Sequence, residues 1–267
     1  FGPKKFRIGV GLPTVMGTDF GFVPPANTVI NTMGGGLPGY FGASILGAVL
    51  EFILSFFVKP LMKIFTPVVT GTVITLMGMS MMPVAFDWVG GGVGNPNYGN
   101  PKFVAVALIV FIVILLLNRY AKGMLNTAAV MIGIVVGYLI SIPMGLVDFS
   151  QVTNASWVQL PQIARFGIDF NPKFVVPFIA GYLVTVIETV GVMETLGEVT
   201  GSKLTENDIV SGVRADAVSS FISPFLGSGP AQTFSQNVGL IPLTKCASKF
   251  VAIVTGVLLI LMSLFPK

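Results

Sequence analysis

The chain has 267 residues, of which 53% are hydrophobic and only 10% are charged. A soluble domain carries about 25% charged residues, so this composition excludes an ordinary soluble fold. Because there is no histidine and only one cysteine, Cys246, the sequence also excludes an internal disulfide and a cysteine–histidine metal centre. We therefore predict no metal site and no cofactor.

Long apolar stretches define the fold class. The uncharged runs 103–117 and 251–265 approach the length that crosses a hydrocarbon core of about 30 Å. In lipid only helices and closed barrels satisfy their own backbone hydrogen bonds, and these runs lack the alternation of a barrel strand. We predict an all-α polytopic membrane protein with roughly nine membrane-embedded segments. In chain order they are 8–25, 37–58, 66–87, 103–118, 124–145, 174–197, 206–226, 229–241 and 247–265.

The net charge of +4 does not indicate nucleic-acid binding, because the basic residues lie in small groups at predicted helix ends. Assigning the loops alternately places all but four of the fifteen lysines and arginines on one side of the membrane. The exceptions are Lys102, Arg165, Lys173 and Lys267. By the positive-inside rule, the side with more lysines and arginines is cytoplasmic.

Two of the predicted segments are too rich in Gly, Pro and polar residues for a continuous lipid-facing helix. They are 17–25 and 227–237. Non-helical backbone survives at membrane depth only where it is buried or lines a cavity, and paired interrupted segments indicate the midplane site of an inverted-repeat transporter. The alternative is that both are ordinary turns at the surface.

Two of the carboxyl groups within the predicted spans are the main candidates for a buried site. Glu188 lies midway along an apolar helix, where an ionised carboxylate facing lipid costs at least about 2.5–3.5 kcal/mol, so we expect it to face the bundle interior and to be able to exchange a proton. Asp216 is a second candidate. Alternatively, Asp216 lies near the start of its helix, close to the surface, and pairs with Arg214.

The remaining acids are assigned by their neighbours. Glu194 and Glu198 lie near Lys203 and are expected at the cytoplasmic end of their helix. For Glu51, close to Lys59 and Lys63, a paired or snorkelling side chain is expected. Asp19 lies in the broken segment itself, where it either adds a second titrating acid to the cavity or points to water.

The run Gln236-Asn237-Val238-Gly239-Leu240-Ile241-Pro242-Leu243-Thr244-Lys245 resembles the signature of the nucleobase–ascorbate transporters. That signature has Gln, Glu or Pro, then Asn, any residue, Gly, four variable residues, Thr, and Arg, Lys or Gly. All of its fixed positions are met. The family's substrate-binding glutamate in a Glu-x-x-Gly context matches Glu188 with Gly191. Glu194 with Gly197 is a competing alignment, but Glu188 is separated from Asp216 and Gln236 by 28 and 48 residues, as in the purine-carrier branch.

The resemblance implies a role for each matching residue. Glu188 and Gln236 would hold the nucleobase edge, and backbone groups at Phe20 and near Ser235 would contact it. Asp216 would take part in proton coupling together with Glu188. The remaining implied substrate-site positions are Asn237 as a brace, Gly239 in the signature, and Thr18, just before the broken strand, where relatives tune purine choice.

The resemblance also implies an architecture of fourteen membrane segments in two inverted halves of seven, with short extended strands in the two broken segments. This chain would cover the third to the eleventh segment and so be an internal fragment. The implied division has a core in two parts, 1–58, with the broken segment 17–25, and 174–267, with the signature 236–245. Between them lie gate helices at 59–147 and an extracellular or periplasmic loop at 148–173.

The predicted function is secondary active transport across the cytoplasmic membrane, by a multi-pass protein, of a purine nucleobase coupled to a proton. Gln236 is a neutral amide that both donates and accepts hydrogen bonds, which suits an oxopurine edge, so xanthine or uric acid is preferred. Alternatives are uracil or another nucleobase, sodium in place of the proton, an anion carrier of the same fold, and an inactive truncated fragment. A homodimer stays open, and an intramembrane enzyme is a remote alternative because the sequence lacks catalytic motifs.

Overall fold

The computed structural model describes residues 7–62 and 67–265. Within these ranges it leaves undescribed the side chains of residues 61, 62, 67, 70, 73, 74, 77, 151, 236 and 243. The charge assignments of Lys4, Lys5, Lys63 and Lys267 therefore lie outside the described residues, as does the side chain of Gln236.

Short and irregular elements precede the first long helix. They are strand β1 (Met16–Thr18), the 3-10 helix η1 (Phe20–Phe22), helix α1 (Val23–Asn27) and the π-helix η2 (Thr28–Thr32). Helix α2 (Gly36–Leu54) follows, and η3 (Ser55–Phe57), α3 (Val58–Met62) and α4 (Pro67–Val89) come next. The segment predicted at 8–25 is thus not a continuous helix, as its Gly and Pro content indicated.

The second half of the chain is also helical. Its first elements are α5 (Pro101–Tyr120), α6 (Met124–Thr127), α7 (Ala129–Ser141), α8 (Ser150–Asn154) and η4 (Pro172–Val175). They are followed by α9 (Val176–Thr200), α10 (Glu206–Ile222), η5 (Ser223–Leu226), strand β2 (Ala231–Thr233), α11 (Ser235–Thr244) and α12 (Lys249–Ser263). The fold is helical apart from one pair of short strands in the described residues, as predicted.

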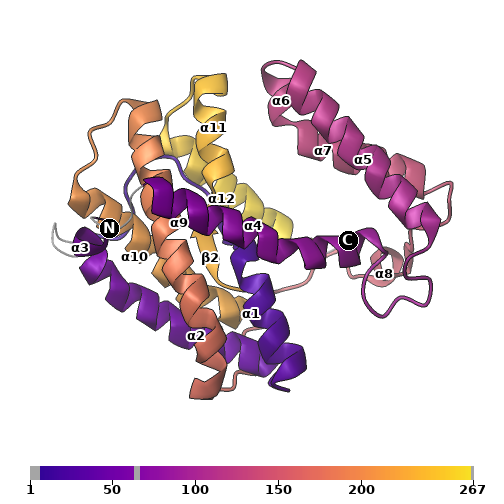
Figure 1. Ribbon diagram of the computed structural model, residues 1–267, viewed down its shortest axis with the longest axis horizontal. Coiled ribbons are helices and arrows are strands. Elements are labelled where there is room, and N and C mark those ends of the chain that lie inside the picture. Colours follow the sequence, from indigo (N-terminus) through magenta and orange to yellow (C-terminus); the bar gives the residue numbers. More distant parts are fainter. Residues whose placement is uncertain (1–6, 63–66, 266–267) are drawn as a thin grey trace. The chain divides into compact units, whose positions relative to one another are not determined.

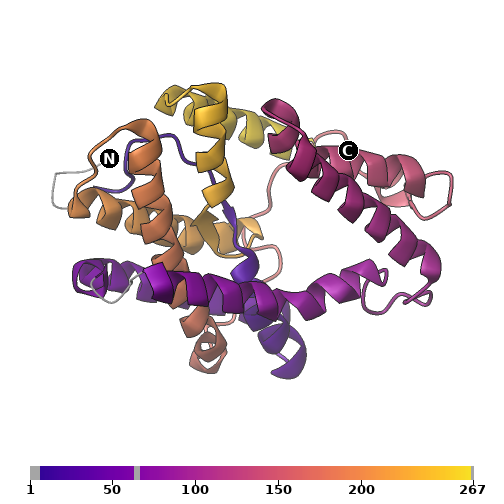
Figure 2. The ribbon, with the colours of Figure 1, turned by 45° about the horizontal axis from the view of Figure 1, so that its top comes forward.

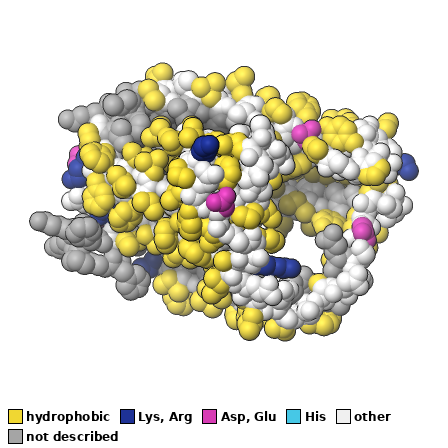
Figure 3. Space-filling view, turned by 90° about the horizontal axis from the view of Figure 1, so that it is seen from below, with side chains coloured by type: hydrophobic (Ala, Val, Ile, Leu, Met, Phe, Trp, Pro, Cys, Tyr) yellow, Lys and Arg dark blue, Asp and Glu magenta, His cyan; other side chains and the backbone are white. Residues whose placement is uncertain are grey.

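Three helices of the described chain are long and apolar enough to cross a membrane. They span Gly36–Pro60, Pro101–Tyr120 and Pro172–Thr200, and Ala129–Ser141 and Lys249–Ser263 are shorter apolar helices. All five coincide with predicted segments. Figure 3 shows a face on which hydrophobic side chains predominate and charges are few and isolated, which suits a surface facing lipid.

The chain divides into two compact units, residues 1–81 with 160–264, and residues 82–159 with 265–267. In the first unit α2 packs against both α9 and α10 (Figure 1). Close approach depends on a small residue, because a Cβ on Gly47 would lie 2.1 Å from the ring of Tyr182. Tyr182 donates its hydroxyl hydrogen to the Ser44 carbonyl at 2.6 Å, so the α2–α9 contact is both packed and hydrogen-bonded.

The second unit is built on α5 and α7, which lie side by side in Figures 1 and 2. A Cβ on Gly133 of α7 would lie 2.6 Å from the side chain of Ile114, so a glycine again permits the approach. Helix α5 begins at Asn100, whose side chain caps the Lys102 amide at 3.0 Å, and Pro101 occupies the first turn. Asparagine caps and first-turn prolines are both favourable.

Candidate functional site

The two broken segments meet as a pair of antiparallel strands. β1 and β2 pair with Met16 opposite Thr233 and Thr18 opposite Ala231. Beyond this ladder, the Asp19 amide donates to the Pro230 carbonyl at 3.0 Å. Segments more than 200 residues apart in the sequence are thus joined backbone to backbone, with β2 buried and β1 partly exposed, so the prediction of strands in both segments is confirmed.

Thr18 is the last residue of β1, not a residue before the strand as predicted. Its hydroxyl hydrogen-bonds to that of Ser228 at 2.8 Å. Phe20 follows in η1, not in extended backbone, and its side chain is 60% exposed. The predicted contacts of these two residues with a ligand remain predictions.

Asp216 of α10 is fully buried and ties three elements together. Thr189 of α9 donates its hydroxyl hydrogen to one carboxyl oxygen at 2.5 Å, and Thr233 of β2 donates to the other at 2.7 Å. The alternative of a surface pair with Arg214 is wrong. Arg214 is itself buried, donates from Nε to the Ser55 hydroxyl at 3.4 Å, and lies 4.8 Å over the ring of Phe56.

Asp19 is also buried, with 7% of its surface exposed, so the interpretation that it points to water is wrong. One carboxyl oxygen accepts from the Gly21 amide at 2.7 Å and caps η1. The other accepts from the hydroxyl of Thr185 on α9 at 3.2 Å. Asp19 therefore fixes the turn after β1 and attaches it to α9.

Glu188 lies on α9 between Thr185, which binds Asp19, and Thr189, which binds Asp216. Residues 185, 188 and 189 share one face of α9, since positions three and four apart are neighbours on a helix, and Glu188 is within electrostatic range of Asp19. Its Oε2 atom is buried and has no hydrogen-bond partner among the described residues. Glu194, the competing choice, is exposed and lines a surface pocket with Glu198 and Lys203. The geometry therefore favours Glu188.

The signature segment begins directly after β2. Ser235 is the first residue of α11 and is exposed, Asn237 is half-buried with its amide donating to the Phe234 carbonyl at 3.3 Å, and Gly239 is exposed. The backbone of Gln236 lies in the first turn of α11. Strand β2 thus brings the signature helix next to the elements that carry Asp19, Glu188 and Asp216.

Sequence reasoning missed the hydroxyl groups that hold the acids. The Thr185-x-x-Glu188-Thr189 spacing was a usable signal, because it places two hydroxyls beside a carboxyl on one helix face. Gln232 of β2 was also missed. Its side chain is buried and its Nε2 has no hydrogen-bond partner among the described residues, so it is a further polar group available to a ligand or water.

The arrangement has a clear chemical consequence. The hydrogen-bond partners of Asp19 and Asp216 are hydroxyl and amide groups, whereas one oxygen of Glu188 has no partner within residues 7–62 and 67–265 as described. Three neighbouring carboxyls in a low-dielectric interior repel one another when ionised. Such a group of acids can exchange protons with changes in occupancy, and Glu188 can accept hydrogen bonds from a bound molecule. No group of metal-ligating side chains occurs among the residues that the structure describes.

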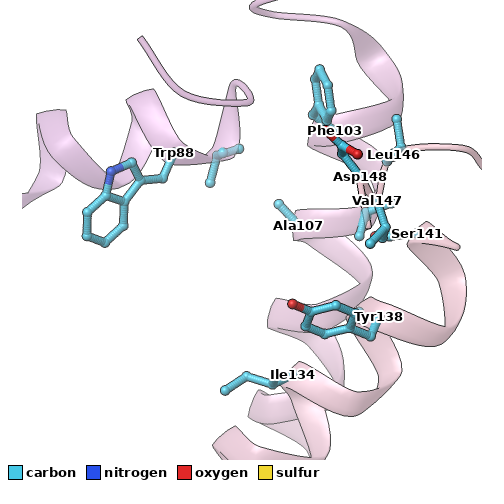
Figure 4. Close-up of a pocket in the computed structure, with 12 residues that line it drawn as sticks. Trp88, Phe103, Ala107, Ile134, Tyr138, Ser141, Leu146, Val147 and Asp148 are labelled. Carbon is cyan, nitrogen blue, oxygen red and sulfur yellow. The ribbon is translucent and has the colours of Figure 1, made fainter. Parts of the chain in front are cut away.

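The second unit contains an open pocket of about 550 Å³ lined by Trp88, Phe103, Ile134, Tyr138 and other mostly apolar side chains (Figure 4). Its one acid, Asp148, is exposed. Hydrogen bonds from the Ser150 amide and hydroxyl keep the pKa of Asp148 below its ordinary value. This pocket lacks the buried acids of the first unit and carries no functional assignment.

Comparison with known proteins agrees with the signature. A family model described as a permease family (Xan_ur_permease) matches residues 5–267. A Clostridium perfringens protein, provisionally named a purine permease, is 47% identical over 98% of this chain and 57% of its own length. The uric acid transporter UacT of Escherichia coli is 40% identical over 97% of this chain and 54% of its own length.

The xanthine permease of Bacillus subtilis is 36% identical over 97% of this chain and 59% of its own length. This chain therefore spans just over half the length of the relatives it matches. These relatives are named as permeases and transporters, not as enzymes.

Proposed function

We propose, on the premise that this chain belongs to the permease family of nucleobase–ascorbate transporters, that it carries the substrate site of a proton-coupled purine symporter. The observation that supports this most directly is Glu188, a carboxyl within a candidate membrane span with one buried oxygen that has no hydrogen-bond partner among the described residues. Family membership itself makes the protein a multi-pass permease of the cell membrane and excludes the intramembrane enzyme.

Glu188 would accept hydrogen bonds from ring N–H groups of the purine, each worth about 1.5–3 kcal/mol because the acceptor is charged. Gln236 would meet the mixed donor and acceptor edge, as its amide allows. Thr18, Phe20 and Ser235 would add contacts from the ends of the paired strands. Asn237 and Gly239 would shape the first turns of α11. The proposed substrates are xanthine and uric acid, the molecules in the names of two relatives.

Asp216 would link the proton to the substrate site. Both of its oxygens accept hydroxyl hydrogens in the structure. Adding a proton would convert one oxygen into a donor, and one threonine hydroxyl would have to turn round and accept. One of these threonines adjoins Glu188 and the other belongs to β2, so protonation would reorganise hydrogen bonds in both elements around the proposed site.

The proposed cycle moves the substrate-binding core, residues 1–58 and 174–267, against gate helices in 59–147. This division into core and gate, with an outer loop at 148–173 and seven segments in each inverted half, is part of the proposal. The membrane and a purine are the proposed partners, and a homodimer remains a prediction without a supporting contact.

Uptake of radiolabelled xanthine by cells that express the full-length protein tests the proposal. Glu188→Gln should abolish uptake while leaving the amount of protein in the membrane unchanged. Glu194→Gln is the matched control, since it alters an exposed glutamate on the same helix, and it should transport normally. Normal uptake by Glu188→Gln, or loss of uptake in Glu194→Gln alone, would contradict the assignment of Glu188 to the substrate site.

Substrate and ion are tested separately. Competition by unlabelled uric acid, guanine, hypoxanthine and uracil should rank xanthine or uric acid first. Uptake should collapse when a protonophore is added and persist in sodium-free buffer. Sodium-dependent uptake, or strongest competition by uracil, would replace the proposed ion or substrate.

A further inference from the structure

Glu51 of α2 is fully buried, and neither of its carboxyl oxygens has a hydrogen-bond partner among the described residues. It lies well inside the candidate span Gly36–Pro60, so the expectation of a snorkelling side chain or of a pair with Lys59 is wrong, while Lys63 lies outside the described residues. Lys59, its expected partner, instead lies 3.5 Å from Glu206. A carboxylate held in this way would be desolvated without compensation.

The position of Glu51 follows from the face of α2 on which it lies. Ser44, Gly47, Glu51 and Ser55 recur at intervals of three and four residues and so form one stripe. At one end of the stripe, the Ser44 carbonyl accepts from Tyr182 of α9. At the other end, the Ser55 hydroxyl accepts from Arg214 of α10. Glu51 lies between these contacts, where α2 packs against both helices.

The titratable and charged groups around Glu51 come from each neighbouring element. Asp216 and Arg214 are on α10, Tyr182 is on α9, and Asp19 follows β1. Glu51 is within electrostatic range of Asp216, Asp19 and Tyr182, and Arg214 is engaged with Ser55 and the ring of Phe56. Glu51 therefore shares a buried region with the acid that is proposed to carry the coupled proton.

We propose that Glu51 is a second proton-holding residue of this core, coupled to Asp216. Two neighbouring buried carboxylates repel each other, so the pair carries at most one negative charge at a time. Transfer of a proton from one of these carboxyls to the other leaves that charge unchanged. Glu51 would keep its proton while Asp216 is ionised and could release it only when Asp216 is protonated. The proposal rests on proton-coupled transport as the proposed function.

The first test does not depend on any substrate. The full-length protein, purified in detergent, is unfolded thermally between about pH 5 and pH 8. A glutamate that is neutral in the fold is ionised after unfolding at these pH values. Unfolding therefore releases a proton, and stability falls as pH rises. Glu51→Gln keeps the shape of the neutral acid and should reduce this fall, whereas Glu51→Asp and the exposed control Glu194→Gln should keep it.

The second test uses proteoliposomes that contain the same variants. Glu51→Gln should retain exchange of labelled for unlabelled xanthine but lose about tenfold in accumulation driven by a proton gradient, and it should show a flattened pH profile of uptake. That factor corresponds to about 1.4 kcal/mol. If the wild-type protein moves no purine, the proposed function fails, but the unfolding test still decides the role of Glu51.

An unchanged pH dependence of unfolding in a folded Glu51→Gln variant would overturn the proposal. So would a Glu51→Asp variant that loses the dependence. If Glu51→Gln does not fold, infrared spectroscopy of the wild-type protein decides. A carboxylic-acid C=O band should be present at neutral pH and should be shifted to another frequency in Glu51→Asp. A wild-type spectrum without such a band contradicts the proposal.

Discussion

In the unit formed by residues 1–81 and 160–264, about half of the most apolar stretch of each long helix is buried, 56% in Gly36–Pro60 and 44% in Pro172–Thr200. In the unit formed by residues 82–159, the helix Pro101–Tyr120 buries none of its most apolar stretch. The more apolar helix is thus the less buried one, as expected when lipid rather than protein is its intended surroundings.

The two units also differ in what they bury. The first encloses Asp19, Glu51, Asp216 and the hydroxyls of Thr185 and Thr189, whereas Asp148 of the second is exposed. Hydropathy therefore shows which segments can lie in a membrane, and enclosed polar side chains show which part of the protein is organised around a site. Three pairs of substitutions in the full-length protein, one in each unit, test this difference.

The largest effect is expected at Asp216. Asp216→Ala leaves the hydroxyls of Thr189 and Thr233 without their acceptor, and each orphaned buried group costs about 1–3 kcal/mol. We expect the free energy of unfolding in detergent to fall by roughly 2–4 kcal/mol. Asp148→Ala, which removes an exposed acid bonded only to Ser150, should cost no more than about 1 kcal/mol. If both variants lost a similar free energy of unfolding, the two units would not differ in how their acids contribute to stability.

A smaller effect is expected from crowding a helix contact. The added methyl group of Gly47→Ala would lie 2.1 Å from the Tyr182 ring, so α2 and α9 must separate at a cost of about 1–3 kcal/mol. In the other unit, the methyl group of Gly137→Ala meets only the end of Val110, at 3.0 Å. Its cost should be clearly lower, as measured by thermal unfolding. A larger loss for Gly137→Ala would show that the second unit is the more tightly packed.

The smallest effect concerns helix caps. Thr205 and Asp208 cap α10 reciprocally, with the Asp208 amide donating to the Thr205 hydroxyl at 3.3 Å and the Thr205 amide donating to the Asp208 carboxyl at 3.0 Å. Thr205→Ala should cost about 1 kcal/mol. Asn100→Ala removes the single capping bond of α5 and should cost less. Thr205→Ala also removes the bond that the Thr205 hydroxyl donates to the Asp208 carboxyl at 2.7 Å. Chemical denaturation of both variants distinguishes the two values, and equal costs would mean that this additional bond contributes nothing.

Much of the fold could be predicted because it depends on local pattern. Apolar length placed α2, α5 and α9, and the Gly and Pro content of 17–25 and 227–237 predicted interruptions where the structure has β1 and β2. The prediction was wrong about the environments of Glu51 and Asp19. Their burial depends on which helices pack against them, and neighbours such as Lys59 give no information on that.

The sequence by itself determined that this is a membrane protein, that its long apolar stretches form helices, that the segments 17–25 and 227–237 are interrupted, and that it carries the signature of a permease family. Composition and motifs can be read along the chain, because they do not depend on contacts between distant residues. Only the tertiary structure decided that Thr189 and Thr233 donate hydrogen bonds to Asp216, that Thr185 donates one to Asp19, and that Glu51 is buried with no hydrogen-bond partner in the part of the chain that the structure describes. Each of these facts arises where distant segments come together, and burial is a property of that arrangement.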